Sequence, residues 1–79
     1  MLNDPSFVAA AKALAKRIEA GAESDASRIK LAMRMAYSRE PDERELRLLK
    51  QLADEQPDET KWFTIARLIL NLDEVITRN

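Results

Sequence analysis

The 79-residue chain contains neither cysteine nor histidine. Without cysteine it can form no disulfide and no thiolate metal site. Without histidine it lacks the commonest general base and the commonest metal ligand. We therefore expect no metal or other cofactor, and we expect the stability of so small a chain to depend on a well-packed apolar core.

The chain is also short of glycine, of long apolar runs and of excess charge. One glycine and 46% apolar residues are typical of a folded helical protein. No apolar run approaches the roughly 20 residues that cross a bilayer, and no signal peptide is recognisable. The compartment, and whether Met1 is a native start, stay open. Thirteen basic and fourteen acidic side chains give a net charge of −1, which argues against a nucleic-acid binder without excluding a local basic patch.

What the sequence does contain is a helical pattern broken at three points. The predicted helices span residues 5–20, 25–38, 43–55 and 59–77. Pro5 suits a first helical turn, and Gly21 is placed to end the first helix in a left-handed conformation. Pro41 ends the second helix, and Asp42 with Glu45 forms a capping box that starts the third.

Each predicted helix carries apolar residues at three- and four-residue spacing, as expected of a face turned toward a core. The stripes comprise Phe7, Ala11, Leu14, Ala15 and Ile18; Ile29, Ala32, Met33 and Ala36; Leu46, Leu49, Leu52 and Ala53; and Trp62, Ile65, Ile69, Leu72 and Ile76. The second helix is also apolar on another side, at Leu31 and Met35, which predicts a central position. We expect an all-α fold, a single compact bundle of four short helices over residues 1–79.

The order of these elements resembles a known family. The stretches LNDPSFVAAAKALAKRI, SRIKLAMRMAYSREPDERELRLL and WFTIARLILNLDEVITRN are similar to the C-terminal part of domain of unknown function 1553, noticed in planctomycetes and often accompanying a cytochrome-c-like domain. The chain departs from the family at Ser38, where a glycine is usual, and at Val75, where an aromatic residue is usual. The most specific elements are Asn3-Asp4-Pro5, Arg28-Ile29, Arg39-x-Pro41 with Glu45, and Leu70-Asn71 followed by Glu74.

The resemblance implies that the chain is the C-terminal module of a larger protein of unassigned activity. An exported parent protein is compatible with it. The haem-binding cysteines of the associated cytochrome domains match nothing in this chain, so the resemblance implies no haem.

Enzyme chemistry has few candidate residues here. Asp73 and Glu74 are neighbours on the last predicted helix and point about 100° apart, so they cannot bind one ion together. The carboxylates of residues 40–45 lie where the dipole of the third helix favours negative charge. Ser27 and Lys30 have a catalytic spacing but lack its companion motifs. We expect that the chain is not an enzyme.

A small helical nucleic-acid-binding domain is the alternative function, and it depends on a basic zone on the second and third helices. This zone comprises Arg28, Lys30, Arg34, Arg39, Arg44, Arg47 and Lys50. Glu43, Glu45 and Asp54 intersperse it, and such alternation of sign usually marks a solvated face.

The favoured function is a non-catalytic scaffold or interaction module that contacts other domains of a parent protein or a protein partner. Apolar residues beside the main stripes are expected to form an exposed partner patch; they are Leu31, Leu48, Phe63 and Leu68. The polar residues expected to hold or dock elements are Arg28, Arg39, Glu45, Asn71 and Glu74. We expect Arg39 and Glu74 to pair, or to cap neighbouring helix ends, and so lock the second helix to the fourth.

Overall fold

The computed structural model describes residues 4–76, with the side chains of residues 4–72. Its helices are α1 (Pro5–Gly21), α2 (Asp25–Tyr37), α3 (Glu43–Asp54) and α4 (Lys61–Ile76). The described residues contain no strand, and no helix among them is long and apolar enough to cross a membrane. The predicted all-α bundle of four helices is therefore confirmed, and the observed helix ends lie within two residues of the predicted ones.

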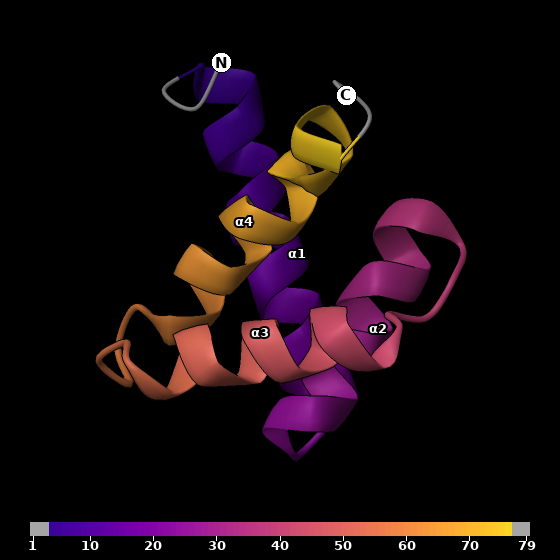
Figure 1. Cartoon of the computed structure of the whole chain (residues 1–79). Coiled ribbons are helices and arrows are strands. Elements are labelled where there is room, and N and C mark those ends of the chain that lie inside the picture. Colours follow the sequence, from indigo (N-terminus) through magenta and orange to yellow (C-terminus); the bar gives the residue numbers. More distant parts are fainter. Residues whose placement is uncertain (1–3, 77–79) are drawn as a thin grey trace.

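α1 and α4 form the most extensive helix pair and run antiparallel, so the start of α1 and the end of α4 lie at the same end of the bundle (Figure 1). α3 runs across the front of this pair (Figure 1) and packs on α2 and α4, and the described part of the chain has no contact between α3 and α1. α2 contacts all three other helices. α4 does so as well, so the central position predicted for α2 is shared with α4.

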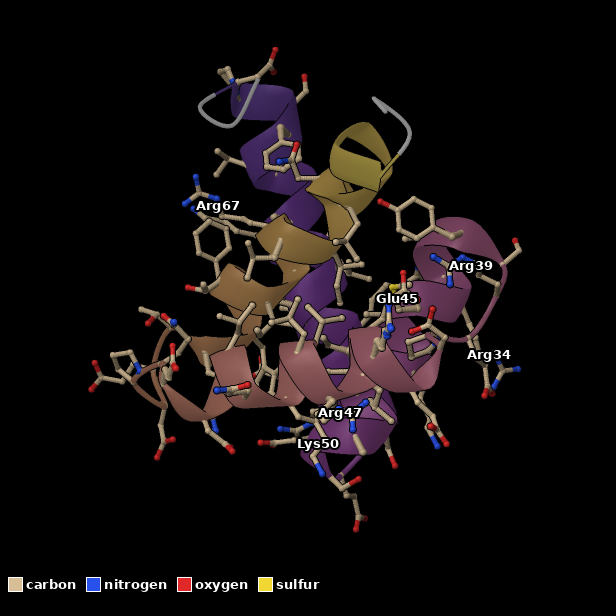
Figure 2. All side chains as sticks on the ribbon, viewed as in Figure 1. Arg34, Arg39, Glu45, Arg47, Lys50 and Arg67 are labelled. Carbon is tan, nitrogen blue, oxygen red and sulfur yellow. The ribbon has the colours of Figure 1, made fainter. Side chains whose placement is uncertain are left out.

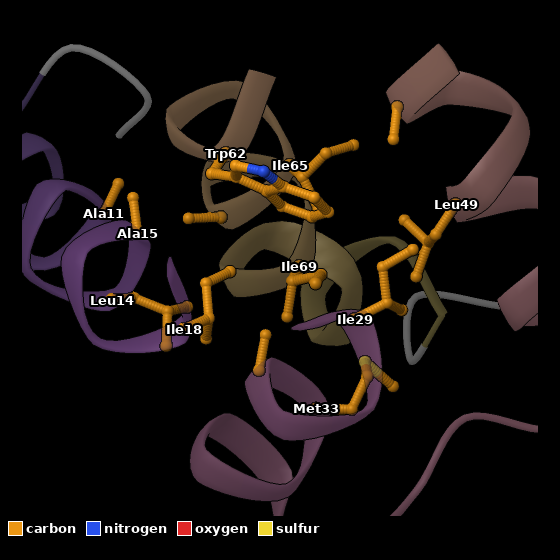
Figure 3. Packing of buried hydrophobic residues seen from close by; sticks show 13 residues of the cluster. Ala11, Leu14, Ala15, Ile18, Ile29, Met33, Leu49, Trp62, Ile65 and Ile69 are labelled. Atoms are coloured by element: carbon orange, nitrogen blue, oxygen red, sulfur yellow. The ribbon is translucent and has the colours of Figure 1, made fainter. Parts of the chain in front are cut away.

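The core consists of thirteen apolar side chains contributed by all four helices (Figure 3). The labelled side chains of α1 lie at one side of the cluster and Leu49 of α3 at the other, with those of α2 and α4 between them (Figure 3). Ile29, Ile65 and Ile69 are fully buried. Each side chain of this size contributes roughly 1.5–3 kcal/mol through burial, and no described polar side chain is buried. The bundle is therefore held mainly by apolar packing.

α1, α2 and α3 each begin at a side chain that accepts a hydrogen bond from a backbone N–H group of the first turn. The Asp4 carboxylate accepts from the N–H of Ser6 at 2.7 Å, and the Ser24 hydroxyl accepts from the N–H of Ser27 at 3.1 Å. Asp42 caps α3 in the same way. Each such cap contributes about 0.5–2 kcal/mol.

The prediction that Gly21 ends α1 in a left-handed conformation is wrong. Gly21 is the last residue of the helix, and Ala22 follows with extended backbone angles (φ −150°, ψ 158°). The left-handed residue is Ser38 at the end of α2 (φ 57°, ψ 30°). A Cβ atom at Gly21 would lie 2.9 Å from Cδ2 of Leu31 on α2, and rotation of that flexible side chain would relieve the contact. Gly21 thus leaves room for the Leu31 side chain at the end of α1.

Candidate functional site

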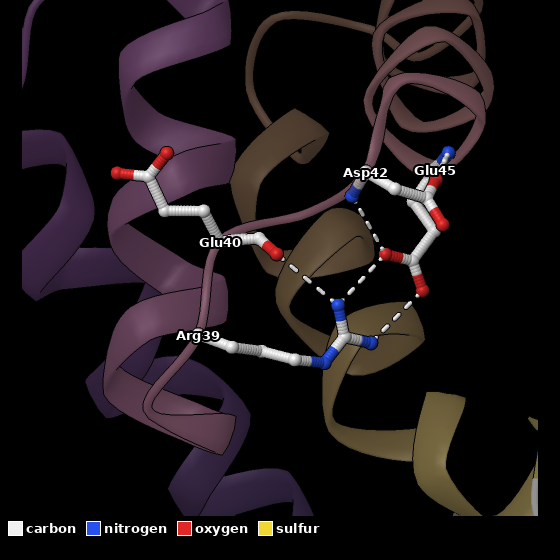
Figure 4. Close-up of polar contacts among 4 residues, drawn as sticks. All are labelled: Arg39, Glu40, Asp42 and Glu45. Atoms are coloured by element: carbon white, nitrogen blue, oxygen red, sulfur yellow. Dashed lines mark hydrogen bonds and ion pairs between the residues drawn. The ribbon is translucent and has the colours of Figure 1, made fainter.

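The connection between α2 and α3 holds two of the predicted polar residues, and we call residues 38–45 the Arg39 turn. Two guanidinium nitrogens of Arg39, Nη1 and Nη2, donate to the two carboxylate oxygens of Glu45 at 2.9 and 3.0 Å (Figure 4). Nη1 also donates to the carbonyl of Glu40 at 3.1 Å. The left-handed backbone of Ser38 reverses the chain just before Arg39. Arg39 therefore clamps the turn that follows α2.

The predicted capping box is confirmed in the same turn. The Asp42 carboxylate accepts from the N–H of Glu45 at 2.8 Å, and the Glu45 carboxylate accepts from the N–H of Asp42 at 3.0 Å. The hydrogen bond from Arg39 lowers the pKa of Glu45; the N–H of Asp42 acts in the same direction, and partial desolvation opposes both. The same pair raises the pKa of Arg39. Glu45 is thus an ionised, fully engaged carboxylate at neutral pH, whose role is to fix the start of α3.

A second polar arrangement surrounds Trp62 at the start of α4, and we call it the Trp62 cluster. Nε of Arg28 donates to the carbonyl of Ala22 at 2.9 Å, and Nη2 donates to that of Glu19 at 3.3 Å. These carbonyls lie at the end of α1, where helical acceptors lack partners within the helix. The guanidinium carbon of Arg28 lies 5.4 Å from the centre of the Trp62 ring. Arg28 thus connects α1, α2 and α4.

Lys61 adds charge contacts to the Trp62 cluster. Its ammonium nitrogen lies 3.6 Å from a carboxylate oxygen of Asp25 and 3.8 Å from one of Asp58. The same nitrogen lies 6.0 Å from the centre of the Trp62 ring, at the outer limit of a cation–π contact. The start of α2 and the start of α4 are therefore held together by a lysine that is largely buried between them, with its side chain 17% exposed.

The remaining predicted polar residues lie on α4. Asn71 is half-buried and lines a shallow groove of about 150 Å³ with Thr64, Arg67 and Leu68. The side chain of Glu74 lies outside the described residues, so its pairing with Arg39 stays a prediction.

Tyr37 is a further polar residue that the sequence did not indicate; its hydroxyl donates to the backbone carbonyl of Ile69. This bond links the end of α2 to α4, which is the role predicted for Arg39 and Glu74. The available signal was a single tyrosine in the last turn of the predicted second helix, because a partly buried tyrosine hydroxyl usually finds a partner.

The predicted apolar patch is only partly exposed. Leu48 and Leu68 are 55% and 37% exposed, whereas Leu31 and Phe63 are half-buried and pack against the core. Met35, which the sequence placed on the second apolar side of its helix, is 40% exposed. Met35 borders a groove of about 270 Å³ between α1, α2 and α4. The residues that line this groove are Ala10, Ala13, Leu14, Arg17, Met35, Ala36 and Leu70. We call it the Met35 groove.

The predicted basic zone is divided in the structure. Arg39 faces Glu45, whereas Arg47 and Lys50 project from α3 (Figure 2). Arg47 and Lys50 line an open surface groove of about 540 Å³ along α3 together with the acidic residues Glu43 and Asp54. That face is mixed in charge. Among the described residues, no group of three or more acidic side chains is placed to hold a metal ion.

Comparison with known proteins identifies the family. A family model described as a protein of unknown function (DUF1553) matches residues 1–53, which include α1, α2, the Arg39 turn and most of α3. Searches of curated proteins and of solved structures find no match. The expected association with planctomycetes and with cytochrome-c-like domains stays a prediction. Because the match covers 53 of 79 residues and includes the predicted family elements around Arg28 and Arg39, the chain belongs to the DUF1553 family.

Proposed function

We propose that this chain is a non-catalytic helical module that contacts other domains and forms the C-terminal part of a larger protein. This proposal rests on the hydrogen bonds that the charged residues of the family elements make within the fold. Arg28 binds the carbonyl groups at the end of α1, and Arg39 binds both oxygens of Glu45. Because these side chains use their hydrogen bonds to stabilise the fold, they are more typical of a scaffold than of a reactive site.

The state of Glu45 supports a non-catalytic role. A general acid or base works best when its pKa lies near the operating pH. The pKa of Glu45 is lowered instead, because Arg39 and the N–H of Asp42 stabilise its charged form. Its carboxylate oxygens are already occupied by these donors, which leaves them poorly placed to take a proton from a substrate.

Exposed apolar side chains supply the contact surface that such a module needs. Met35, Leu48 and Leu68 lie on three different helices and are each more than a third exposed. A single exposed leucine is ordinary on any protein, but an apolar side chain beside a groove is typical of a partner surface. Met35 meets that description because it lines the Met35 groove.

The basic zone on α2 and α3 does not favour binding to nucleic acid. Two of the seven residues in its basic zone, Arg28 and Arg39, are engaged in internal contacts. Two others, Arg47 and Lys50, share their groove with acidic residues. A phosphate backbone would meet a mixed field on this face instead of a positive one.

The proposal is tested in the native protein. We expect mass spectrometry of source cells to find these peptides in a protein longer than 79 residues. We also expect amide hydrogen exchange in that protein to be slower over one continuous surface of this module than in the isolated chain. A native protein of only 79 residues would contradict the larger-protein part. Unchanged exchange over the whole module would contradict the domain-contact part.

A further inference from the structure

The Met35 groove is a concave apolar surface formed by three helices. α1 contributes Ala10 and Ala13, α2 contributes Met35, and α4 contributes Leu70. The two alanines are exposed, and their small side chains let another backbone come close to α1. Met35 is unbranched and can adjust its shape to a partner. The groove therefore has two small alanine side chains on α1 and an adaptable apolar side chain on α2.

The size of the groove favours a protein segment over a small molecule. Sites for drug-sized ligands have volumes of about 300–1,000 Å³ and enclose most of the ligand. The Met35 groove, at about 270 Å³, lies at the small end of that range and is largely open to solvent, so it would enclose little of such a ligand. A volume of this kind suits one or two bulky side chains that anchor a longer element lying along the surface.

The charge around the groove indicates which charge a bound protein segment should carry. Among the described residues that line the groove, Arg17 is the one that carries a charge, and it is exposed. The two helices that supply most of the lining are both cationic, although the whole chain has a net charge of −1. α1 carries Lys12, Lys16 and Arg17 against Glu19, and α2 carries Arg28, Lys30 and Arg34 against Asp25. An acidic partner would meet a favourable field, and a basic partner an unfavourable one.

We propose that the Met35 groove binds an acidic amphipathic helix from another domain of the parent protein. This inference rests on the proposed function. Apolar residues on one face of that helix, spaced three and four residues apart, contact Met35, Ala10 and Leu70. A carboxylate one turn away pairs with Arg17. Helices commonly bind in grooves by this arrangement, in which apolar anchors give affinity and charges at the rim give orientation.

The test uses the 79-residue chain and designed helical peptides of about 18 residues. One peptide carries a leucine stripe and glutamates beside it, and two matched peptides carry glutamine or lysine in place of the glutamates. We expect the glutamate peptide to shift the amide NMR signals of the groove residues, with a dissociation constant of tens of micromolar. We expect the lysine peptide to bind at least about tenfold more weakly, and the difference to shrink as salt is added.

Three variants of the chain separate the apolar and charged contributions. Met35→Gln keeps the size of the side chain but adds a polar amide, and should weaken the glutamate peptide about fivefold or more. Arg17→Glu should reduce the preference for the glutamate peptide over the lysine peptide, which mere loss of folding cannot do. Arg44→Glu, exposed on α3 and outside the groove, makes the same change of charge as Arg17→Glu; it should leave the preference for the glutamate peptide nearly unchanged and serves as the matched control.

The outcomes distinguish this inference from the proposed function. Absence of shifts at millimolar peptide, equal binding of the lysine peptide, or shifts on α3 in place of the groove would each overturn the inference. Sedimentation that shows a dimer weakened by Met35→Gln would also overturn it, because a second copy would then be the occupant. If hydrogen exchange in the native protein shows a protected surface away from the groove, the proposed function stands and this inference fails. If the native protein has only 79 residues, the proposed function fails and the peptide data still decide whether the groove is a site.

Discussion

The Trp62 cluster and the Arg39 turn each contain an arginine beside a terminus of α2, but the two arginines act over different ranges. Arg39 binds Glu45 six residues further along the chain, so it stabilises one turn. Arg28 binds carbonyl groups at the end of α1 and lies over Trp62, more than thirty residues later in the chain. A contact within one turn therefore determines the local path of the chain, whereas a contact with a buried ring holds separate helices together.

Replacing Trp62 should have the largest effect on stability, because it removes the buried ring that Arg28 covers. Trp62 is 4% exposed and packs within the core. Trp62→Ala should lower the free energy of unfolding by about 3–5 kcal/mol, measured by urea denaturation. Phe63→Ala is the matched control, and its effect should be smaller because Phe63 is only half-buried. Equal losses for the two aromatic residues would show that the Trp62 cluster has no special importance.

Removing the arginine of each clamp tests the comparison directly. Arg28→Met keeps the apolar stem but loses the bonds to α1 and the contact with the ring, so we expect a loss of about 1–2 kcal/mol. Arg39→Met should cost less than about 1 kcal/mol, because its side chain is 46% exposed and solvent screens the pair. Both losses are measured by urea denaturation. A larger loss for Arg39 would reverse our ranking of the two regions.

Arg28→Lys should not restore the stability lost in Arg28→Met. A lysine keeps the positive charge but has no planar group that can bond two carbonyls while covering an aromatic ring. Full recovery in this variant would mean that charge alone accounts for the contribution of Arg28.

The sequence predicted the contacts of the Arg39 turn well. The capping box of Asp42 and Glu45 and the break at Pro41 were readable because all their partners lie within a few residues. The four helices followed from apolar spacing for the same reason. Three-residue and four-residue periodicity places side chains on one face whatever the rest of the chain does.

The long-range half could not be predicted from the sequence. Nothing near Arg28 indicates that Trp62 lies beside it, since the two residues become neighbours only after α4 packs against α1 and α2. Gly21 shows the same limit. Its position after an apolar stripe is typical of a left-handed end, but it has no positive φ, and its nearest neighbour on another helix is the side chain of Leu31. The bond from Tyr37 to Ile69 likewise depends on the packing of two distant segments.

Ser38 offers a way to strengthen the Arg39 turn. Its left-handed backbone (φ 57°) is unfavourable for a residue with a Cβ atom and costs glycine little. Ser38→Gly should therefore raise the free energy of unfolding by about 0.5–1 kcal/mol, after the extra freedom of glycine in the unfolded chain is allowed for. Thermal and urea unfolding measure the change, and Ser6→Gly, inside the first turn of α1, should have the opposite sign.

The smallest predicted effect isolates the charge of Glu45. Because Arg39 lowers its pKa, the folded state holds this proton less tightly than the unfolded state does. The resulting stabilisation is present above the ordinary glutamate pKa of about 4 and is lost as the pH falls through the lower pKa of the folded state. Glu45→Gln retains an acceptor for the capping box and removes the charge, so it should cost about 0.5 kcal/mol near neutral pH.

That cost should disappear in acid, where the wild-type carboxyl is itself neutral. Urea unfolding of both proteins across this pH range measures it, and a double-mutant cycle with Arg39→Met assigns the coupling. We expect Arg39 to couple with Glu45 more strongly than with Glu74, because both oxygens of Glu45 already accept from Arg39. A stronger coupling to Glu74 would make Arg39 a second long-range clamp. A difference between wild type and Glu45→Gln that persists in acid would instead assign the contribution of Glu45 to its shape, since at that pH the charge has gone from both proteins.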